Sequence, residues 1–197
     1  MPHGIATGQP ALFLDRDGIV NVDTDFAHRP EHIAFMDGIF DLVRQARAAG
    51  YVPVIVTNQS GIARGYFSEA AFLDLTDWMI ARFEAEDAAV ARVYHCPYPP
   101  AATVAQYRHP DHPWRKPRPG MLLQARHDLG LDLSRSAMIG DRWSDAGAAS
   151  AAGVPHIALV GDRADREPLT AEPVPVTRLD SVVACSGWLA GLATSRL

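Results

Sequence analysis

Residues 13–18, Phe13-Leu14-Asp15-Arg16-Asp17-Gly18, place two carboxylates two positions apart directly after an apolar run. That run, Ala11 to Leu14, is short and uniformly apolar, as in a buried strand. Neighbouring acids raise each other's pKa unless a cation joins them, and Mg²⁺ relieves the repulsion through oxygen ligands. An Asp-rich turn explains the stretch equally well on its own, because Asp and Gly are common turn residues. The segment therefore predicts a strand end and leaves a metal site and a plain turn both open.

Short apolar runs alternate with helical patterns along the rest of the chain. Further strands are predicted at residues 52–56, 90–94, 137–139 and 154–160. Helices are predicted between them, with Ser68 as an N-cap and Gly50 and Gly130 as stop signals. The alternation predicts an α/β fold, a doubly wound parallel sheet with helices on both faces, in which ligands bind at the carboxyl ends of the strands. The tail after Asp162 is predicted as a loop followed by a short terminal helix over residues 179–192.

Polar residues follow other predicted strands at the same edge of the sheet. Asp141 and Asp145 form a second acidic cluster, although acids are also favoured at a helix N-terminus. Residues 57–61, Thr57-Asn58-Gln59-Ser60-Gly61, offer polar groups that could hold a phosphate, or serve as a helix cap and turn. Lys116 offers the fixed charge that a phosphoryl group needs, or forms a solvated surface pair with its neighbouring arginine. Two acidic clusters at one edge favour the metal site over separate turns.

The composition narrows the class of function. The 197 residues carry a formal net charge of −5, which gives no electrostatic footprint for nucleic acid. No apolar run approaches the roughly 20 residues that span a membrane, and residues 1–10 do not read as a signal peptide. Two distant cysteines, Cys96 and Cys185, make no disulfide framework. We therefore expect a cytoplasmic protein, a monomer or small homo-oligomer, that binds neither nucleic acid nor membranes.

Four segments, taken in chain order, carry a resemblance to a known family. Residues 15–18 and 57–61, Arg115-Lys116-Pro117 and Ile139-Gly140-Asp141 resemble the four motifs of haloacid dehalogenase-like (HAD-like) phosphatases. The residues of these motifs are most similar to those of the branch that contains heptose 1,7-bisphosphate and histidinol-phosphate phosphatases, and the similarity covers residues 11–160. The resemblance implies a single HAD-like phosphatase domain over residues 1–197, Rossmann-like and without a large cap domain, in which residues 162–197 have no assigned role.

The resemblance also implies catalytic roles for three residues. Asp15 would attack phosphorus and form an aspartyl-phosphate, which divides one difficult hydrolysis into two easier displacements. Asp17 would protonate the leaving alcohol and then take a proton from the attacking water. Lys116 would neutralise Asp15 and the phosphate together.

Binding roles follow from the same resemblance. Thr57 and Asn58 would bind the phosphoryl oxygens, and Arg115 would contact the substrate. Mg²⁺ would be held by the Asp15 carboxylate, the Asp17 backbone carbonyl and Asp141. Asp145 would be an outer or water-bridged ligand.

One loop departs from the pattern of the family. Relatives in this branch often carry a structural zinc loop, Cys-x-His and then Cys-x-Cys just before the Arg-Lys-Pro motif. Here Cys96 is present, but Tyr98 stands in place of the histidine, and His112 and Trp114 stand in place of the two cysteines. Trp cannot bind zinc, and neighbouring histidines would complete a set that matches no common zinc spacing. We therefore expect no structural Zn²⁺ and a loop held by its prolines, Tyr98 and Trp114.

The length of the chain indicates an open site, because it leaves no room for a large inserted cap. Residues 23–32 and 94–114 are then expected to shape the rim. Arg64, Arg115 and His28 are candidates for gripping a second phosphate or a sugar, and each is equally interpretable as a surface residue.

The resemblance implies a Mg²⁺-dependent phosphomonoester hydrolase that acts on a small phosphorylated metabolite. The leading substrate is D-glycero-D-manno-heptose 1,7-bisphosphate at its 7-phosphate, and histidinol phosphate is the alternative. A polynucleotide 3′-phosphatase would need a basic groove, which the net charge of −5 argues against. A mutase would need a closed site that excludes water. A non-catalytic phosphate-binding protein on the same fold would be expected to lack Asp15 or Asp17, and both are present.

Overall fold

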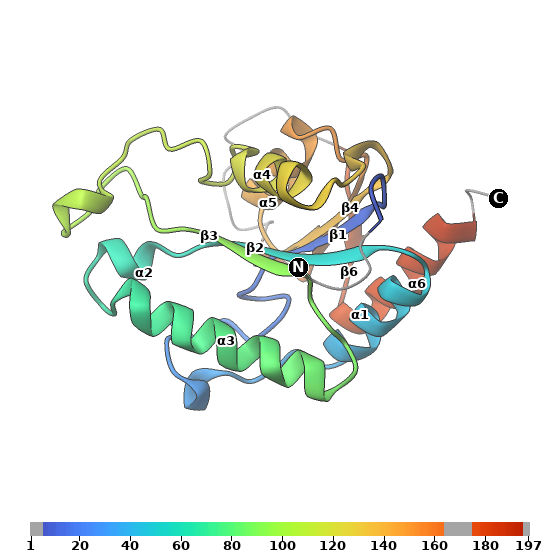
Figure 1. Cartoon of the computed structure of the whole chain (residues 1–197), viewed down its shortest axis with the longest axis horizontal. Helices are drawn as coiled ribbons and strands as arrows, with labels where there is room; N and C mark the ends of the chain where they lie inside the picture. The colour runs from blue at the N-terminus through green and yellow to red at the C-terminus, as the bar shows by residue number, and fades with distance from the viewer. Residues whose placement is uncertain (1–5, 164–174, 195–197) are drawn as a thin grey trace.

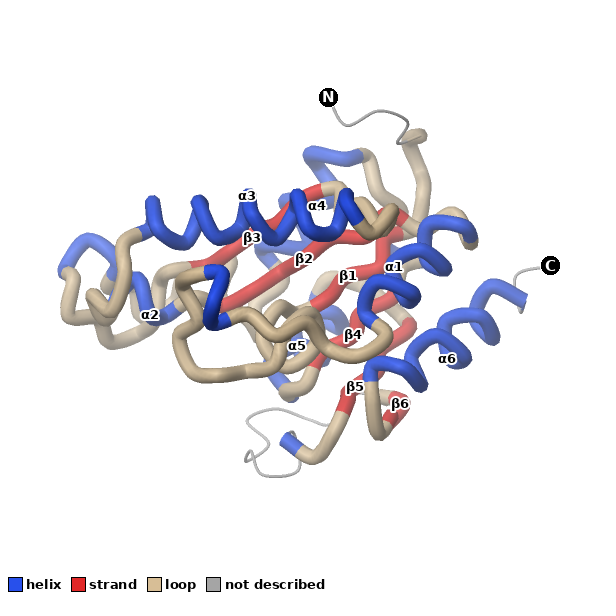
Figure 2. Tube along the Cα trace, turned by 90° about the horizontal axis from the view of Figure 1, so that it is seen from below, coloured by secondary structure: helices blue, strands red, loops and turns tan. Residues whose placement is uncertain are grey.

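The computed structural model describes residues 6–163 and 175–194, which form one sheet with helices on both faces (Figure 1). The sheet has six parallel strands in the order β3-β2-β1-β4-β5-β6 (Figure 2). They are β1 (Ala11–Leu14), β2 (Val52–Asn58), β3 (Arg92–Cys96), β4 (Ala137–Gly140), β5 (His156–Val160) and β6 (Thr177–Leu179). The chain builds outward from β1 in both directions. The predicted doubly wound parallel sheet is confirmed, and its switch point lies at the carboxyl ends of β1 and β4.

Helices pack on the two faces in separate groups. The first face carries α1 (Ile39–Ala48), α3 (Glu69–Ala85) and α6 (Val182–Thr194). The opposite face carries α4 (Gly120–Leu129) and α5 (Trp143–Ala151). The remaining short helices are α2 (Ser60–Ala63) and the 3-10 turns Pro30–His32, Ala105–Tyr107 and Leu133–Arg135.

The side chains of β1 supply both cores. Leu12 and Leu14 are fully buried in the core that contains α1, α3 and α6. Ala11 and Phe13 are fully buried in the core that contains α4 and α5. A strand buried on both faces needs apolar residues at every position, which explains why this stretch of sequence does not alternate.

Local signals set several of the boundaries. The Ser68 hydroxyl accepts a hydrogen bond from the Ala71 N–H at 3.1 Å and caps α3, as predicted. Gly130 ends α4 with φ of +66°, a conformation that glycine adopts without a Cβ penalty. The third strand lies two residues later than predicted, because its ladder begins with Arg92 opposite Val54.

The C-terminal segment contributes to the sheet as well as to a helix. β6 pairs with β5, and α6 then packs against α1. The sequence predicted a helix over residues 179–192 but no strand, because β6 has three residues and the first two are exposed. Residues 164–174 of the predicted loop lie outside the described residues. None of the described helices is long and apolar enough to span a membrane.

Candidate active site

Three aspartates meet at the switch point of the sheet, two from adjacent strand ends and one from the helix that follows the second strand. Asp15 follows β1 and Asp141 follows β4, and these two strands pair directly. Asp145 lies in the first turn of α5. All three are buried, and their carboxylate oxygens lie within 4.8 Å of one another. The fold therefore brings together the two acidic clusters that lie far apart in the sequence.

Asp145 also explains why α5 begins at Trp143, before the Ala-rich run of residues 146–152. Its Oδ2 accepts hydrogen bonds from the backbone N–H of Asp141 at 3.2 Å and of Arg142 at 3.0 Å. These bonds satisfy backbone donors that a helix N-terminus leaves unpaired. The helix consequently starts at Trp143, and Asp145 is fixed by backbone as well as by charge.

A single buried lysine joins two of the aspartates. Lys116 is the only lysine in the chain, and it is 3% exposed. Its Nζ lies 2.9 Å from Asp15 Oδ1, 2.6 Å from Asp145 Oδ1 and 2.8 Å from the carbonyl oxygen of Val56. An ammonium group has three donors, so each has an acceptor. The interpretation of Lys116 as a solvated surface residue is therefore wrong.

The cluster holds more negative than positive charge. Burial and the neighbouring Asp145 raise the pKa of Asp15 well above its usual range, despite Lys116. The same two causes raise the pKa of Asp141 to about 7. Burial alone would lower the pKa of Lys116, but Asp145 and Asp15 raise it above its ordinary value. The protein thus concentrates carboxylates that one ammonium does not neutralise.

These residues fit a divalent cation. Asp141 Oδ1 is buried and accepts no hydrogen bond from any residue that the structure describes. A hard cation with oxygen ligands would occupy that oxygen and relieve the repulsion between Asp15 and Asp141. Across residues 6–163 and 175–194, this is the one group of His, Cys, Asp and Glu side chains close enough to share an ion.

Two glycines leave room for the carboxylates. Gly18 has φ of +91°, and a Cβ there would lie 2.4 Å from Asp141 Oδ2. A Cβ on Gly140 would lie 2.3 Å from the Cβ of Asp145. Side chains at these positions would displace the two aspartates. This explains physically why the first and fourth motifs have glycine there.

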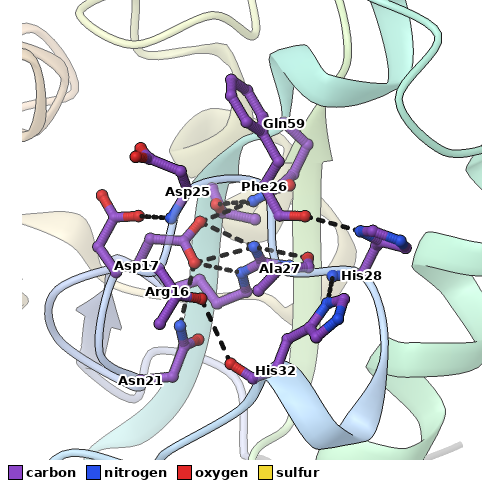
Figure 3. Close-up of polar contacts among 12 residues, drawn as sticks. Arg16, Asp17, Asn21, Asp25, Phe26, Ala27, His28, His32 and Gln59 are labelled. Atoms are coloured by element: carbon purple, nitrogen blue, oxygen red, sulfur yellow. Dashed lines mark hydrogen bonds and ion pairs between the residues drawn. The ribbon is translucent and has the colours of Figure 1, made fainter.

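Asp17 is held by a different set of residues (Figure 3). Arg16 donates to Asp17 Oδ1 from Nε at 3.0 Å and from Nη2 at 2.8 Å, and Nη2 also reaches Oδ2 at 2.9 Å. Asn21 donates to Oδ1 at 3.1 Å, and Gln59 donates to Oδ2 at 3.0 Å. The sequence assigned no role to Arg16 or Asn21, and it placed Gln59 only within residues 57–61, the segment that could hold a phosphate. The position of Arg16 between two acids of the first motif, Asp15 and Asp17, was the sequence signal that could have identified it.

The end of β2 supplies the predicted phosphate-binding residues. The Thr57 hydroxyl oxygen accepts a hydrogen bond from Gln59 Nε2 at 2.9 Å, so its own proton can be donated to a ligand. The Asn58 amide exchanges two hydrogen bonds of 3.1 Å with the backbone of Lys116. Asn58 therefore also fixes the Arg-Lys-Pro segment, which the sequence did not indicate.

One cavity of about 610 Å³ lies over these groups. It is lined by Asp15, Asp17, Asp23, Asp25, Phe26, Thr57, Asn58, Gln59, Ser60, Gly61, Arg64, Arg115, Lys116, Pro117, Arg142, Trp143 and Ser144. The three predicted catalytic residues are in this set, as are Thr57, Asn58, Arg64 and Arg115 among the predicted substrate-binding residues, and Asp141 lies within 4.8 Å of Asp15. His28 instead lines a neighbouring hollow of about 570 Å³. No inserted cap domain covers the cavity within residues 6–163, as expected.

Two arginines on the cavity wall have no carboxylate partner among the described residues. Burial lowers the pKa of Arg115, and the like charge of Arg64 adds to this effect. Arg115 Nη1 is buried without a hydrogen-bond partner in the described part of the chain. Arg64 lies over the ring of Phe26, with 5.7 Å between its guanidinium carbon and the ring centroid. The cavity therefore presents two positive groups to an anion.

A rim contact that the sequence did not reveal involves Asp23 and Arg163. Burial would raise the pKa of Asp23, but hydrogen bonds from Arg163 and from the Asp25 N–H lower it. Arg163 Nη1 also lies 3.3 Å from Asp141 Oδ2. Arg163 follows β5, so a fourth strand end contributes to the site, after those of β1, β2 and β4. The residue was missed because it stands alone in the Pro-rich tail, without a motif around it.

Aromatic rings hold the 97–113 loop, the residues between Cys96 and Trp114. The Tyr98 ring stacks on His112 with centroids 4.1 Å apart, and Tyr107 lies 5.9 Å from Tyr98. Cys96 Sγ lies 3.9 Å from His112 Nδ1. Within the described residues, these side chains join no third ligand in a metal-binding arrangement.

Comparisons with known proteins agree with this geometry. Residues 113–184 match the HAD-hydrolase-like family. The chain is 47% identical over 153 residues to D-glycero-alpha-D-manno-heptose-1,7-bisphosphate 7-phosphatase of Burkholderia mallei, covering 78% of this chain and 80% of the relative. It is 44% identical over 156 residues to D-glycero-beta-D-manno-heptose-1,7-bisphosphate 7-phosphatase of Escherichia coli K12, covering 79% and 81%.

A solved structure shares the fold along nearly its whole length. It is D,D-heptose 1,7-bisphosphate phosphatase from B. bronchiseptica complexed with magnesium and phosphate, with a TM-score of 0.76 and 28% identity, covering 92% of this chain and 98% of that one. Sequence identity, fold and the cluster of aspartates at the switch point all agree. The protein is therefore a phosphatase that belongs to the HAD-like family.

Proposed function

We propose that the protein removes the 7-phosphate of D-glycero-D-manno-heptose 1,7-bisphosphate in a Mg²⁺-dependent reaction. The observation that carries the proposal is the pair of arginines, Arg64 and Arg115, in the same cavity as Asp15. Lys116 has all its donors engaged by Asp15, Asp145 and a backbone carbonyl. A second phosphate would therefore be bound by the arginines. The relatives named above act on bisphosphates of this kind, according to their names.

The residues divide the chemistry between them. Asp15 forms a bond to phosphorus while the bond from phosphorus to the leaving oxygen breaks, and Asp17 gives that oxygen a proton. Water then attacks the aspartyl-phosphate, Asp17 takes its proton, and inorganic phosphate is released. Thr57 donates a hydrogen bond to a phosphoryl oxygen, and Asn58 has one amide hydrogen left for another.

Mg²⁺ would be held by the Asp15 carboxylate, the Asp17 backbone carbonyl and Asp141. When bound, it would offset the charge of the transferring phosphoryl group. Asp145 would support this site through Lys116, because its Oδ1 lies 2.6 Å from Nζ. We expect these events to take place in the cytoplasm, in a monomer or small homo-oligomer.

Histidinol phosphate is the alternative substrate. It carries one phosphate and a cationic amine, which two unpaired guanidinium groups would repel. A bisphosphate would place one phosphate at the phosphoryl end of the cavity, beside Asp15 and Lys116, and the other at the two arginines. Arg64 and Arg115 therefore favour a bisphosphate over histidinol phosphate. A non-catalytic phosphate-binding role is disfavoured by the presence of both Asp15 and Asp17.

The test is phosphate release from a panel of esters, with Mg²⁺ and with EDTA. The panel contains the α and β heptose 1,7-bisphosphates, fructose 1,6-bisphosphate and histidinol phosphate. Faster phosphate release from one heptose bisphosphate anomer than from the other esters, with the activity lost in EDTA, would support the proposal and identify the anomer. Arg64→Gln and Arg115→Gln should each raise the KM for the bisphosphate more than the KM for histidinol phosphate. Equal rates on all esters, or a preference for histidinol phosphate, would contradict it.

A further inference from the structure

Arg16 is buried and turns back onto the next residue in the chain (Figure 3). It is 2% exposed, and its guanidinium carbon lies 5.6 Å from the centroid of the Phe72 ring on α3. Its Nη1 is buried and has no hydrogen-bond partner among the described residues. Burying a charged group costs free energy unless an opposite charge faces it, and here the opposite charge is Asp17.

The Asp17 carboxylate is fixed from three sides. It accepts five hydrogen bonds in total from Arg16, Asn21 and Gln59. Its side chain stays 24% exposed, on the wall of the cavity. Asp15 and Asp17 are two positions apart, yet each has its own cation, Lys116 for Asp15 and Arg16 for Asp17.

The same guanidinium reaches the rim of the cavity. Arg16 Nη2 donates to the carbonyl oxygen of Ala27 at 3.3 Å. The two residues before Ala27 are held in the left-handed region, Asp25 with φ of +56° and Phe26 with φ of +57°. Non-glycine residues adopt this conformation at a cost and keep it where the surroundings fix it. The Phe26 ring packs edge-on against Tyr66, with 4.7 Å between centroids.

We propose that Arg16 is a positioning residue for the acid–base chemistry. Its guanidinium fixes the Asp17 carboxylate toward the cavity and ties it to the rim at Ala27, so that Asp17 meets the leaving oxygen of a bound ester. The inference rests on the role proposed above for Asp17. The step requires a proton on one Asp17 oxygen in the complex with the ester. As the bond from phosphorus to the leaving oxygen breaks and the bond to Asp15 forms, that proton moves to the leaving oxygen. Asp17 regains a proton from the water that attacks in the second step.

The experiment compares two esters that differ in their need for that proton. An alkoxide must be protonated as it leaves, whereas p-nitrophenolate leaves as a stable anion. We would measure kcat/KM for glycerol 2-phosphate and for p-nitrophenyl phosphate at the same Mg²⁺ concentration, because kcat/KM reports the step in which the leaving group departs and excludes the later hydrolysis that both esters share. Arg16→Met should lower kcat/KM for the alkyl ester at least about tenfold more than for the aryl ester. Arg16→Lys should recover part of the loss, because it keeps the charge without the two-pronged geometry.

Two further variants make the result decisive. Arg82→Met replaces an exposed arginine on α3 and should leave the ratio of the two rates unchanged. Asp17→Asn should change the ratio in the same direction as Arg16→Met. If it lowers both rates equally, the acid–base role of Asp17 is wrong, and the proposed mechanism fails with it. A second outcome is that Asp17→Asn changes the ratio of the two rates while folded Arg16→Met lowers both rates equally. That outcome would overturn only the positioning role of Arg16. Should Arg16→Met not fold, the same ratio in Arg16→Lys decides.

Discussion

The phosphoryl end of the cavity and the 97–113 loop are held in opposite ways. At the phosphoryl end, Asp15 and Asp145 lie 2.9 Å and 2.6 Å from one buried ammonium group. In the loop, Tyr98 stacks on His112 with ring centroids 4.1 Å apart. Breaking a buried charge pair costs about 3–5 kcal/mol, whereas an aromatic pair contributes about 0.5–1.5 kcal/mol. The comparison implies that losing the one shared cation destabilises the phosphoryl end, which the proposed mechanism makes the catalytic end, far more than losing one ring destabilises the loop.

The strongest test of the catalytic end is Asp15→Asn. The amide is a poor nucleophile, so kcat for phosphate release should fall by at least about 10³-fold. The protein should stay folded, because the amide removes a buried negative charge that Asp145 and Asp141 repel. The matched control, Asp74→Asn on the exposed side of α3, should keep full activity. Retained turnover in folded Asp15→Asn would refute the assignment of the nucleophile.

Lys116→Met tests whether the catalytic end depends on its counter-charge. The substitution leaves Asp15 and Asp145 buried without the ammonium between them, and it should lower the free energy of unfolding by about 3–5 kcal/mol. Urea denaturation in the presence of EDTA measures the effect. A loss below about 1 kcal/mol would mean that the carboxylates shed their charge by protonation, and that Lys116 serves substrate binding alone.

The pH dependence of stability sharpens the comparison, because the two ends titrate with opposite sign. In the loop, burial lowers the pKa of His112, so its contribution to folding is lost as the pH falls. In the metal-free protein the pKa of Asp141 is raised from 3.8 to about 7, and that of Asp15 is raised in the same direction. A carboxyl with a raised pKa favours folding while it is protonated. The free energy of unfolding should therefore fall as the pH rises from about 4 to 7, by up to about 1.4 kcal/mol per pH unit for Asp141, and Asp15 adds a change of the same sign.

The change in Tm on adding Mg²⁺ tests the same carboxylates in their deprotonated form. The ion binds the deprotonated carboxylates, so its stabilising effect on Tm should be larger at pH 8 than at pH 6. Asp141→Asn should remove most of this difference while leaving the fold intact. A shift in Tm that is equal at both pH values would show that Asp141 does not titrate in this range.

The same contrast explains what could be predicted from the sequence. The order of strands and the meeting of Asp15 with Asp141 follow from apolar runs that end in acids, because parallel strands place their carboxyl ends at one edge. Lys116 was assigned to the phosphoryl group, but its bond to Asp145 depends on where α5 starts, and no residue pattern fixes that position within one turn. The role of Arg16 was missed because its burial and its contact with Ala27 depend on how an irregular segment folds. Arg163 was missed because no motif surrounds it and its partner Asp23 lies far away in the sequence.

The 97–113 loop is held by weaker interactions than the phosphoryl end, so substitutions in it have the smallest predicted effect on stability. A structural zinc would need four ligands, and Tyr98 and Trp114 occupy two of the positions where relatives often have them. We therefore expect elemental analysis to find no stoichiometric zinc, and chelation to leave Tm unchanged once Mg²⁺ effects are subtracted. Tyr98→Leu should lower the free energy of unfolding by about 0.5–1.5 kcal/mol, the contribution of one ring pair, with Tyr98→Phe as the control that keeps the ring stacked on His112. One zinc per chain, with a fall in Tm on its removal, would show that Cys96 and His112 recruit ligands from elsewhere and that both ends of the site are held by charge.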